Sequence, residues 1–107
     1  MTAPPVAQLA ALADDTRWRI LELLGSRPRS ASALAKELPV TRQAIAKHLA
    51  VLEAAGLVGS ERVGRAVEHR AIGASLSELA DRLDRIGRAW DARLERVARR
   101  AEARADA

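Results

Sequence analysis

Four neighbouring residues have the types and spacing of a surface that reads the major groove of DNA. Arg42 and Gln43 carry long hydrogen-bonding side chains, and Lys47 follows about one helical turn later. Arginine pairs with O6 and N7 of guanine, and glutamine pairs with N6 and N7 of adenine. Ala46 is too small to hold a helix away from the base edges. We therefore expect Arg42 and Gln43 to contact bases and Lys47 to contact a phosphate.

A second interpretation of these residues stays open from the sequence alone. A surface helix can carry a solvated basic face, in which Arg42 and Gln43 would contact only phosphate or water. Thr41 directly precedes them and is a preferred residue for a helix N-cap, with a hydroxyl that could also reach a phosphate. The DNA-contacting residues expected from this segment are Thr41, Arg42, Gln43, Ala46 and Lys47.

Residues 41–55 predict a helix with two different sides. Successive residues are about 100° apart around a helix axis, which sorts them by side. The outer side holds polar and methyl-sized residues: Arg42, Gln43, Ala46, Lys47, Ala50 and Ala54. The inner side holds Ala44, Ile45, His48, Leu49, Val51, Leu52 and Ala55. Because His48 falls on the inner side, we expect a packed, hydrogen-bonded histidine there.

This helix is predicted to be the second of a helix-turn-helix unit over residues 30–55. Ser30 or Ser32 can cap the first helix of the unit. Pro39 does not fit a helix interior, so residues 38–40 form the turn. The first helix should direct three apolar residues inward: Leu34, Ala35 and Leu38.

Two further helices are expected before this unit. The first covers residues 6–13, after an end at 1–5 that we expect to be disordered. The second begins after Asp14 or Asp15, either of which can cap it, and stops within 25–28. Its inward residues should be Ile20, Leu21, Leu23 and Leu24.

After Gly56, which suits the left-handed position past a helix end, residues 57–72 predict a β-hairpin. Arg62 and Arg65 flank Gly64 and would give this wing a basic tip. Such a tip suits a phosphate or the minor groove of DNA. We expect Arg62, Gly64 and Arg65 to lie against DNA, with a solvated turn as the alternative.

A long helix is predicted over residues 75–101. Ser75 and Glu78 have the spacing of a capping box, which would place Ser75 at the N-cap. An apolar stripe then continues for roughly 39 Å of helix, which is more than a domain of this size can cover. We expect a second copy of the chain to cover it through Leu79, Leu83, Ile86, Trp90, Leu94 and Val97.

The composition predicts one cytoplasmic domain over residues 1–107. No apolar run approaches the roughly 20 residues of a membrane span, and no segment has the pattern of a signal peptide. Residues 27–70 contain eight basic and four acidic side chains, whereas residues from Ser75 onward contain eight and seven. The positive excess therefore coincides with the helix-turn-helix unit and the hairpin, where phosphates would lie.

The sequence offers no arrangement for catalysis, a metal or a cofactor. It has no cysteine, and its two histidines, His48 and His69, fall in the predicted helix over residues 41–55 and in the predicted hairpin. It has no phosphate-binding loop and no dinucleotide fingerprint. We therefore expect a protein that is not an enzyme and that uses no cofactor.

The order of helices and hairpin, mainly α with a small β-hairpin, is that of a winged helix-turn-helix protein. Three separated motifs resemble the ArsR (arsenical-resistance repressor) family of bacterial transcription regulators. They are LADDTRWRILELL, LAKELPVTRQAIAKHLAVLEAAGLV and RVGRAVEHR, which cover roughly residues 9–72 in the order of the family. The tail WDARLERV is similar to the branch of the family that lacks metal ligands.

The resemblance implies a homodimeric repressor that binds double-stranded DNA. Its recognition helices would enter successive major grooves, with the wings near the flanking minor grooves. The metal sensors of the family use a Cys-x-Cys pair, or Asp, His and Glu on the last helix, and this chain has neither cysteine nor a histidine there. No metal is thus expected, and the effector is unknown. The alternative function is a winged-helix module whose last helix binds a different protein.

Overall fold

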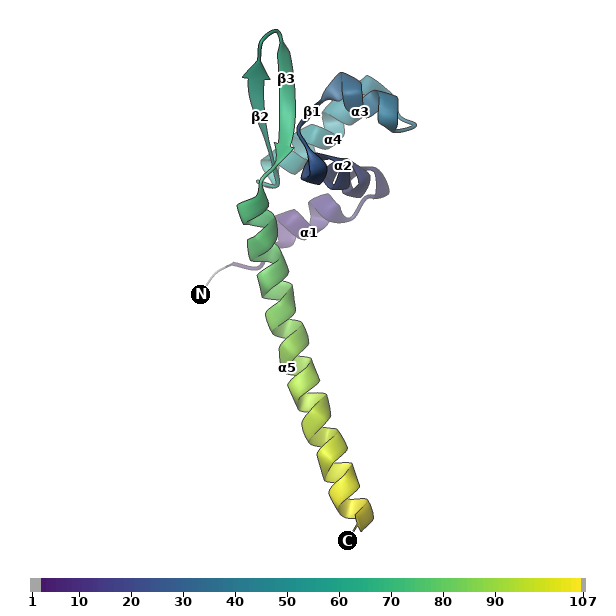
Figure 1. The fold of residues 1–107 in the computed structure, drawn as a ribbon, viewed down its shortest axis with the longest axis vertical. Helices are drawn as coiled ribbons and strands as arrows, with labels where there is room; N and C mark the ends of the chain where they lie inside the picture. Colours follow the sequence, from purple (N-terminus) through teal and green to yellow (C-terminus); the bar gives the residue numbers. More distant parts are fainter. Residues whose placement is uncertain (1–2, 107) are drawn as a thin grey trace. The chain divides into compact units, whose positions relative to one another are not determined.

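The computed structural model describes residues 3–106, which form helices and one small sheet (Figure 1). The elements are α1 (Val6–Leu12), α2 (Asp15–Ser26), β1 (Arg29–Ser30), α3 (Ala31–Glu37), α4 (Arg42–Ala54), β2 (Val58–Val63), β3 (Ala66–Ala71) and α5 (Gly73–Asp106). They divide into two compact units, and the division falls inside α5 after Leu76. Residues 3–5 contain no helix or strand, and the rest of the end expected at 1–5 lies outside the described residues.

Side chains that cap helix ends determine where three helices of the first unit begin. Asp14 Oδ2 accepts from the backbone N–H of Arg17 at 2.9 Å, so Asp14 rather than Asp15 caps α2. Ser30 Oγ accepts from Ala33 at 3.1 Å and caps α3. Thr41 Oγ1 accepts from Ala44 at 3.1 Å and caps α4, as predicted. Each side chain satisfies a backbone donor that has no partner within its helix.

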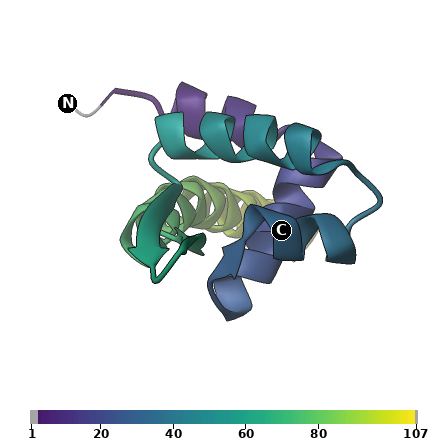
Figure 2. The same cartoon turned by 90° about the horizontal axis from the view of Figure 1, so that it is seen from above.

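The core of the first unit comes from the apolar sides of α2, α3 and α4. Five large side chains of the core are fully buried: Ile20, Leu34, Ile45, Leu52 and, between α4 and β2, Leu57. Val51 was predicted to face inward, but its side chain is 42% exposed. Helix α1 lies alongside α4 (Figure 2). The prediction was wrong because the α1 residues beside Val51 are alanines, which are too short to cover a valine.

The predicted hairpin is confirmed as β2 and β3, which pair antiparallel from Val58↔Ala71 to Val63↔Ala66. Gly64 has φ of 63°, and among residues 3–106 only glycines have positive φ, so the turn has the form of type II′. The sequence did not predict β1, which pairs Arg29 with His69 and makes β3 the central strand of three. A strand of two residues has no alternation for a sequence pattern to show.

The last helix begins earlier than predicted and ends later. It spans 34 residues from Gly73, so Ser75 lies inside it and the proposed capping box at Ser75 was wrong. The physical reason is that the hairpin fixes Ile72, whose N–H donates to the Leu57 carbonyl at 2.9 Å. The Ile72 carbonyl in turn accepts from Ser75 and Leu76, which starts the helix directly after β3.

The Asp14 cap predicts a pH-dependent contribution to stability. The hydrogen bond from the Arg17 N–H, helped by the guanidinium charge of Arg17, holds the pKa of Asp14 below its ordinary value. A lowered pKa means that the ionised carboxylate stabilises the fold at neutral pH, and that this contribution is lost as the pH falls through the folded-state pKa. Asp14→Ala should therefore lower the melting temperature at pH 7.

The difference in melting temperature between Asp14→Ala and the wild type should shrink towards zero as the pH falls below the ordinary pKa range of aspartate. Thermal unfolding followed by circular dichroism measures this difference. Asp15→Ala removes the same charge from the same turn without touching the capping bond, so it should have a smaller effect. An equal effect of the two variants would mean that the charge matters and the cap does not.

Candidate nucleic-acid interface

The outer side of α4 is exposed as the sequence predicts. Arg42, Gln43, Ala46 and Lys47 are all exposed, and so is Ala50 one turn later. On the opposite side of the same helix, the inward residues are at most 2% exposed: Ile45, Leu49 and Leu52. Burial on one side therefore fixes which side chains α4 presents to solvent.

Thr41 has a structural role and keeps the capacity for a second one. Its hydroxyl accepts the N-cap hydrogen bond from Ala44. A hydroxyl can donate one hydrogen bond as well as accept two, so Thr41 can still donate to a phosphate oxygen. The residue is exposed at the start of the helix, where the backbone N–H groups and the helix dipole also favour an anion.

The hairpin has two faces of different character. Residues paired across an antiparallel ladder lie on the same face, and successive residues of a strand lie on opposite faces. One face carries Val58, Ser60, Arg62, Val67, His69 and Ala71. On this face His69 contacts α4, so Arg62 lies on the same side of the wing as that contact. Gly64 and Arg65 form the exposed turn at the tip.

The other face of the hairpin is less suited to phosphates. It places Glu61 directly opposite Glu68. The Arg70 guanidinium lies over Gly59 across the strand, where a Cβ would be in ordinary contact with its Cζ at 3.5 Å. Two carboxylates at one cross-strand position would repel a DNA backbone. The face with Arg62 is therefore the better candidate for DNA.

Arg29 does not belong to the positive surface, although the charge count over residues 27–70 included it. Its side chain is only 7% exposed, and Nη1 donates to the carbonyl of Leu23 near the end of α2. Its Nε lies 3.1 Å from Oε2 of Glu37 at the end of α3, which makes an ion pair although Nε forms no hydrogen bond. Arg29 thus holds two helix ends together.

His48 is packed and hydrogen-bonded, as predicted. Its Nδ1 lies 3.4 Å from Nη1 of Arg17 and 3.9 Å from Oδ2 of Asp14. Arg17 also donates from Nε to the carbonyl of Ala11 at 2.6 Å. One guanidinium therefore contacts the end of α1 and the inner side of α4.

His69 makes a contact that the sequence did not reveal. Its Nδ1 lies 3.3 Å from Oε1 of Glu53, which is in the last turn of α4. The His69 side chain is 14% exposed, whereas that of Glu53 is 38% exposed. No spacing rule connects two residues 16 positions apart on a helix and a strand, so only the fold shows this pair.

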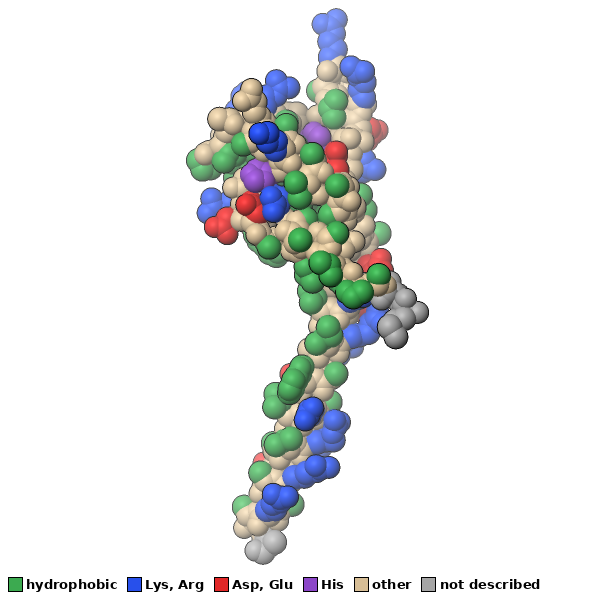
Figure 3. Space-filling view, turned by 180° about the vertical axis from the view of Figure 1, so that it is seen from behind, with side chains coloured by type: hydrophobic (Ala, Val, Ile, Leu, Met, Phe, Trp, Pro, Cys, Tyr) green, Lys and Arg blue, Asp and Glu red, His purple; other side chains and the backbone are tan. Residues whose placement is uncertain are grey.

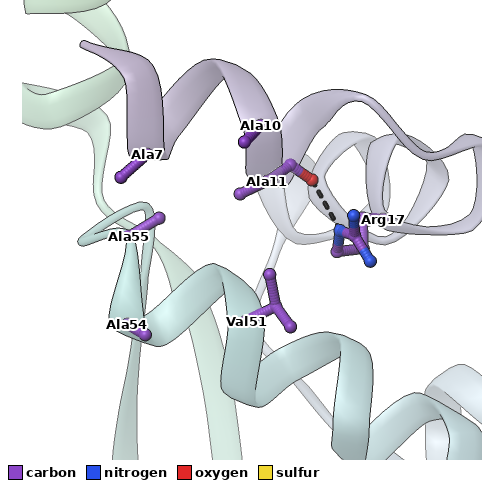
Figure 4. A pocket seen from close by; sticks show the side chains of 7 residues that line it. All are labelled: Ala7, Ala10, Ala11, Arg17, Val51, Ala54 and Ala55. Carbon is purple, nitrogen blue, oxygen red and sulfur yellow. Dashed lines mark hydrogen bonds between the residues drawn. The ribbon is translucent and has the colours of Figure 1, made fainter.

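A cavity of about 400 Å³ lies between α1 and α4 (Figure 4). Small side chains line most of it, and Arg17 closes one end where it bonds to the Ala11 carbonyl. Its apolar walls come from Ala7, Ala10, Ala11, Val51, Ala54 and Ala55. This cavity is the reason that Val51 keeps its exposure.

The second unit, considered alone, is an amphipathic helix. Hydrophobic side chains follow one side of it, and arginine side chains gather beside them (Figure 3). Leu79 is 6% exposed, but the rest of the predicted stripe is between 51% and 62% exposed: Leu83, Ile86, Trp90, Leu94 and Val97. The Arg93 guanidinium lies 5.5 Å from the Trp90 ring centre, within range of a cation–π contact.

Two features of the described residues bear on partners other than DNA. Across residues 3–106, no three His, Cys, Asp or Glu side chains come together in a way that could hold a metal ion. None of the helices in the same range has the length and apolar character that a bilayer crossing requires.

The core formed by α2, α3 and α4, the exposed outer side of α4 and the hairpin define a winged helix-turn-helix protein. Comparison with known proteins agrees, since a family model described as a helix-turn-helix domain matches residues 12–61. The chain is 40% identical over 76 residues to the HTH-type transcriptional regulator Rv2034 of Mycobacterium tuberculosis, covering 71% of both proteins.

Two solved structures extend the comparison. An ArsR-like transcriptional regulator from Rhodococcus sp. RHA1 is 54% identical with a TM-score of 0.77, covering 87% of this chain and 88% of that one. The homodimeric winged helix-turn-helix DNA-binding domain Mb0332 from Mycobacterium bovis, a possible ArsR-family regulator, is 25% identical with a TM-score of 0.64, covering 81% and 90%. This chain belongs to the ArsR-like family of helix-turn-helix transcriptional regulators, so the predicted fold class and family are confirmed.

Proposed function

We propose that this regulator is a sequence-specific repressor that binds an inverted-repeat operator in double-stranded DNA as a homodimer. The observation that carries the proposal is the outer side of α4, where Arg42, Gln43 and Lys47 are exposed around Ala46. A helix that enters the major groove needs long donors on its first turns and small residues between them. This helix has both, on a side that the buried core leaves accessible.

The wing extends the same surface. Arg62 lies on the hairpin face that contacts α4, and Arg65 follows Gly64 in the exposed turn. In this proposal α4 reads bases in the major groove, and the wing contacts the backbone or the minor groove beside it. Thr41 and Lys47 add phosphate contacts that set the register of α4.

The exposed stripe of α5 supports the homodimer. Five large apolar residues along one helix side are more than half exposed, and a soluble protein seldom leaves such a stripe in water. A two-fold pair would cover the stripe with its own copy and would place two α4 helices on one duplex. Two-fold symmetry is also why the operator should be an inverted repeat, with half-sites about one helical turn apart.

The proposal also covers the location of the protein, catalysis and control by metals. The chain acts on DNA in the cytoplasm, catalyses no reaction, and is not switched by a metal held by cysteine or by histidine on the last helix. The alternative function, a module that binds a different protein through α5, gains no support from the relatives, which are transcriptional regulators.

Selection of duplexes from a randomised library tests the proposal directly. The wild-type protein should enrich an inverted repeat and should shift it at moderate salt in the presence of competitor DNA. Enrichment of no sequence, or equal binding of all duplexes, would contradict a sequence-specific repressor. A reporter gene downstream of the enriched site should lose expression when the protein is present, and a gain would contradict repression.

Arg42 provides a test of base reading. Arg42→Ala should weaken binding by about 1–3 kcal/mol and relax the preference at one position of each half-site. Arg42→Lys keeps the positive charge but loses the planar pair of donors, so it should lose the preference while retaining much of the affinity. Competition with single-base operator variants measures both effects. If Arg42→Lys keeps the wild-type preference, Arg42 contacts only phosphate.

Lys47 and Arg65 provide a test of phosphate contact. Lys47→Ala and Arg65→Ala should each lower affinity for all duplexes and reduce the slope of log K against log salt by about one unit. Titrations at four or more salt concentrations measure the slope. Arg99→Ala removes the same charge from α5, outside the proposed contact surface, and should leave the slope unchanged.

Ile86 provides a test of the dimer. Ile86→Glu places a charge in the stripe and should raise the dissociation constant of the dimer by about tenfold or more, since burial of one isoleucine contributes roughly 2 kcal/mol. Ala92→Glu adds the same charge outside the stripe and should have little effect. Sedimentation equilibrium measures both variants. A wild-type protein that stays monomeric, or equal effects of the two changes, would contradict the dimer through α5.

A further inference from the structure

The contact between Glu53 and His69 is the strongest feature that the proposed function leaves unexplained. Glu53 lies on the same side of α4 as Arg42, three turns further along, since eleven residues rotate the helix by about three full turns. A carboxylate there opposes the DNA phosphates, and in the last turn of a helix it also opposes the helix dipole. Both effects disfavour an acid at this position, and a partner close to Glu53 would offset them.

His69 supplies that partner. Within residues 3–106, the bond between His69 Nδ1 and Glu53 Oε1 is the side-chain hydrogen bond that joins α4 to the hairpin. His69 lies on the central strand, opposite Ser60 on β2 and Arg29 on β1. It is therefore held by two neighbouring strands at the base of the wing.

The part of the wing beyond His69 has no such support. Ser60 to Val67 are all exposed, so the hairpin projects past the helices without packing on them (Figure 1). Arg62 lies on the same face as His69, roughly 7 Å further along the strand. Any tilt of the hairpin at its base would move Arg62 and Arg65 relative to α4.

We propose that Glu53 and His69 are positioning residues, which hold the wing at a fixed angle to α4 so that both can contact one duplex at the same time. The proposal rests on the proposed DNA-binding function and adds a role to two residues that touch no DNA. Its consequence is that removing a negative charge from the DNA-facing side of the protein should weaken binding, the opposite of what simple electrostatics predicts.

Three single variants separate positioning from charge, with a duplex enriched by the wild-type protein as the probe. Glu53→Ala should weaken binding by about three- to tenfold, the loss of a typical contact made by the wing. Glu53→Gln removes the same charge but keeps an oxygen that accepts from His69, so it should bind at least as well as the wild type. Glu61→Ala removes a negative charge from the other face of the wing and should not weaken binding.

Double variants test whether the effect passes through the wing. In the Arg65→Ala background, Glu53→Ala should have little further effect, whereas in the Arg42→Ala background its effect should persist in full. In the complex of DNA with the Glu53→Ala variant, protection of the DNA from hydroxyl radicals should fade at the flanks of each half-site, where the wing binds. It should remain at the centre, where α4 binds. Because Glu53 is partly exposed, melting temperatures should change little.

The outcomes separate this inference from the proposed function. Equal weakening by Glu53→Ala and Glu53→Gln, additive effects with Arg65→Ala, or unchanged affinity of Glu53→Ala would each overturn the positioning role. Failure of the wild type to enrich or bind any duplex would instead overturn the DNA-binding proposal itself.

Discussion

Burial of one side of α4 is the constraint on which the rest of the structure depends. Ile45, Leu49 and Leu52 are almost completely buried, and they recur at the spacing of a single helix side. Once these three are in the core, the rotation of α4 about its axis is fixed, and so are the side chains that remain outside. A rotation of even one residue step, about 100°, would expose a leucine and bury an arginine. Because such a rotation is energetically costly, the residues on the outer side of α4 stay exposed, although none of them contributes to the core.

The fold fixes the remaining degrees of freedom of α4 by separate contacts at its two ends. Thr41 caps the first turn, and the preceding turn at Pro39 stops α3 before it can run on into α4. On the inner side, His48 contacts Arg17, and in the last turn Glu53 contacts His69. Apolar burial therefore sets the rotation of α4 about its axis. Polar contacts set the residue at which α4 begins and its orientation to the wing. Specific recognition needs both, since a base-reading side chain must be placed to within a fraction of an ångström.

The sequence predicted the features that depend on local patterns and missed those that depend on contacts between distant residues. The cap at Thr41 and the turn at Gly64 follow from residue type and position. For α2 and α3 the same rules left two candidate caps each, Asp14 or Asp15 and Ser30 or Ser32, and the structure selects Asp14 and Ser30. The outer side of α4 follows from periodicity. The strand β1 and the Glu53–His69 contact each require two segments far apart in the sequence to meet in space, and no single window of sequence contains both. Arg29 was missed for a different reason: a charge count does not distinguish exposed arginines from buried ones, and Arg29 is buried between the ends of α2 and α3.

The start of α5 shows how tertiary structure overrides a good local signal. Ser75 and Glu78 have the capping-box spacing, yet the helix begins at Gly73. The N–H of Ile72 extends the bonding between the strand and Leu57, and its carbonyl then receives the first bonds of the helix. The chain passes from sheet to helix at one residue, which leaves no room for a separate cap.

The division of the chain into two units has a consequence for how such a regulator could be controlled. The core of the first unit is complete without the exposed residues of α5, so loss of the α5 stripe need not unfold the surface formed by α4 and the wing. One recognition helix with one wing makes few contacts, and affinity then depends on linking two of them, because the second binds at the high effective concentration that the first provides. Any change that weakens pairing of α5 would lower operator affinity without altering a single DNA-contacting residue. Control could therefore act on association rather than on the shape of α4, which would require no metal site or ligand beside the recognition helix.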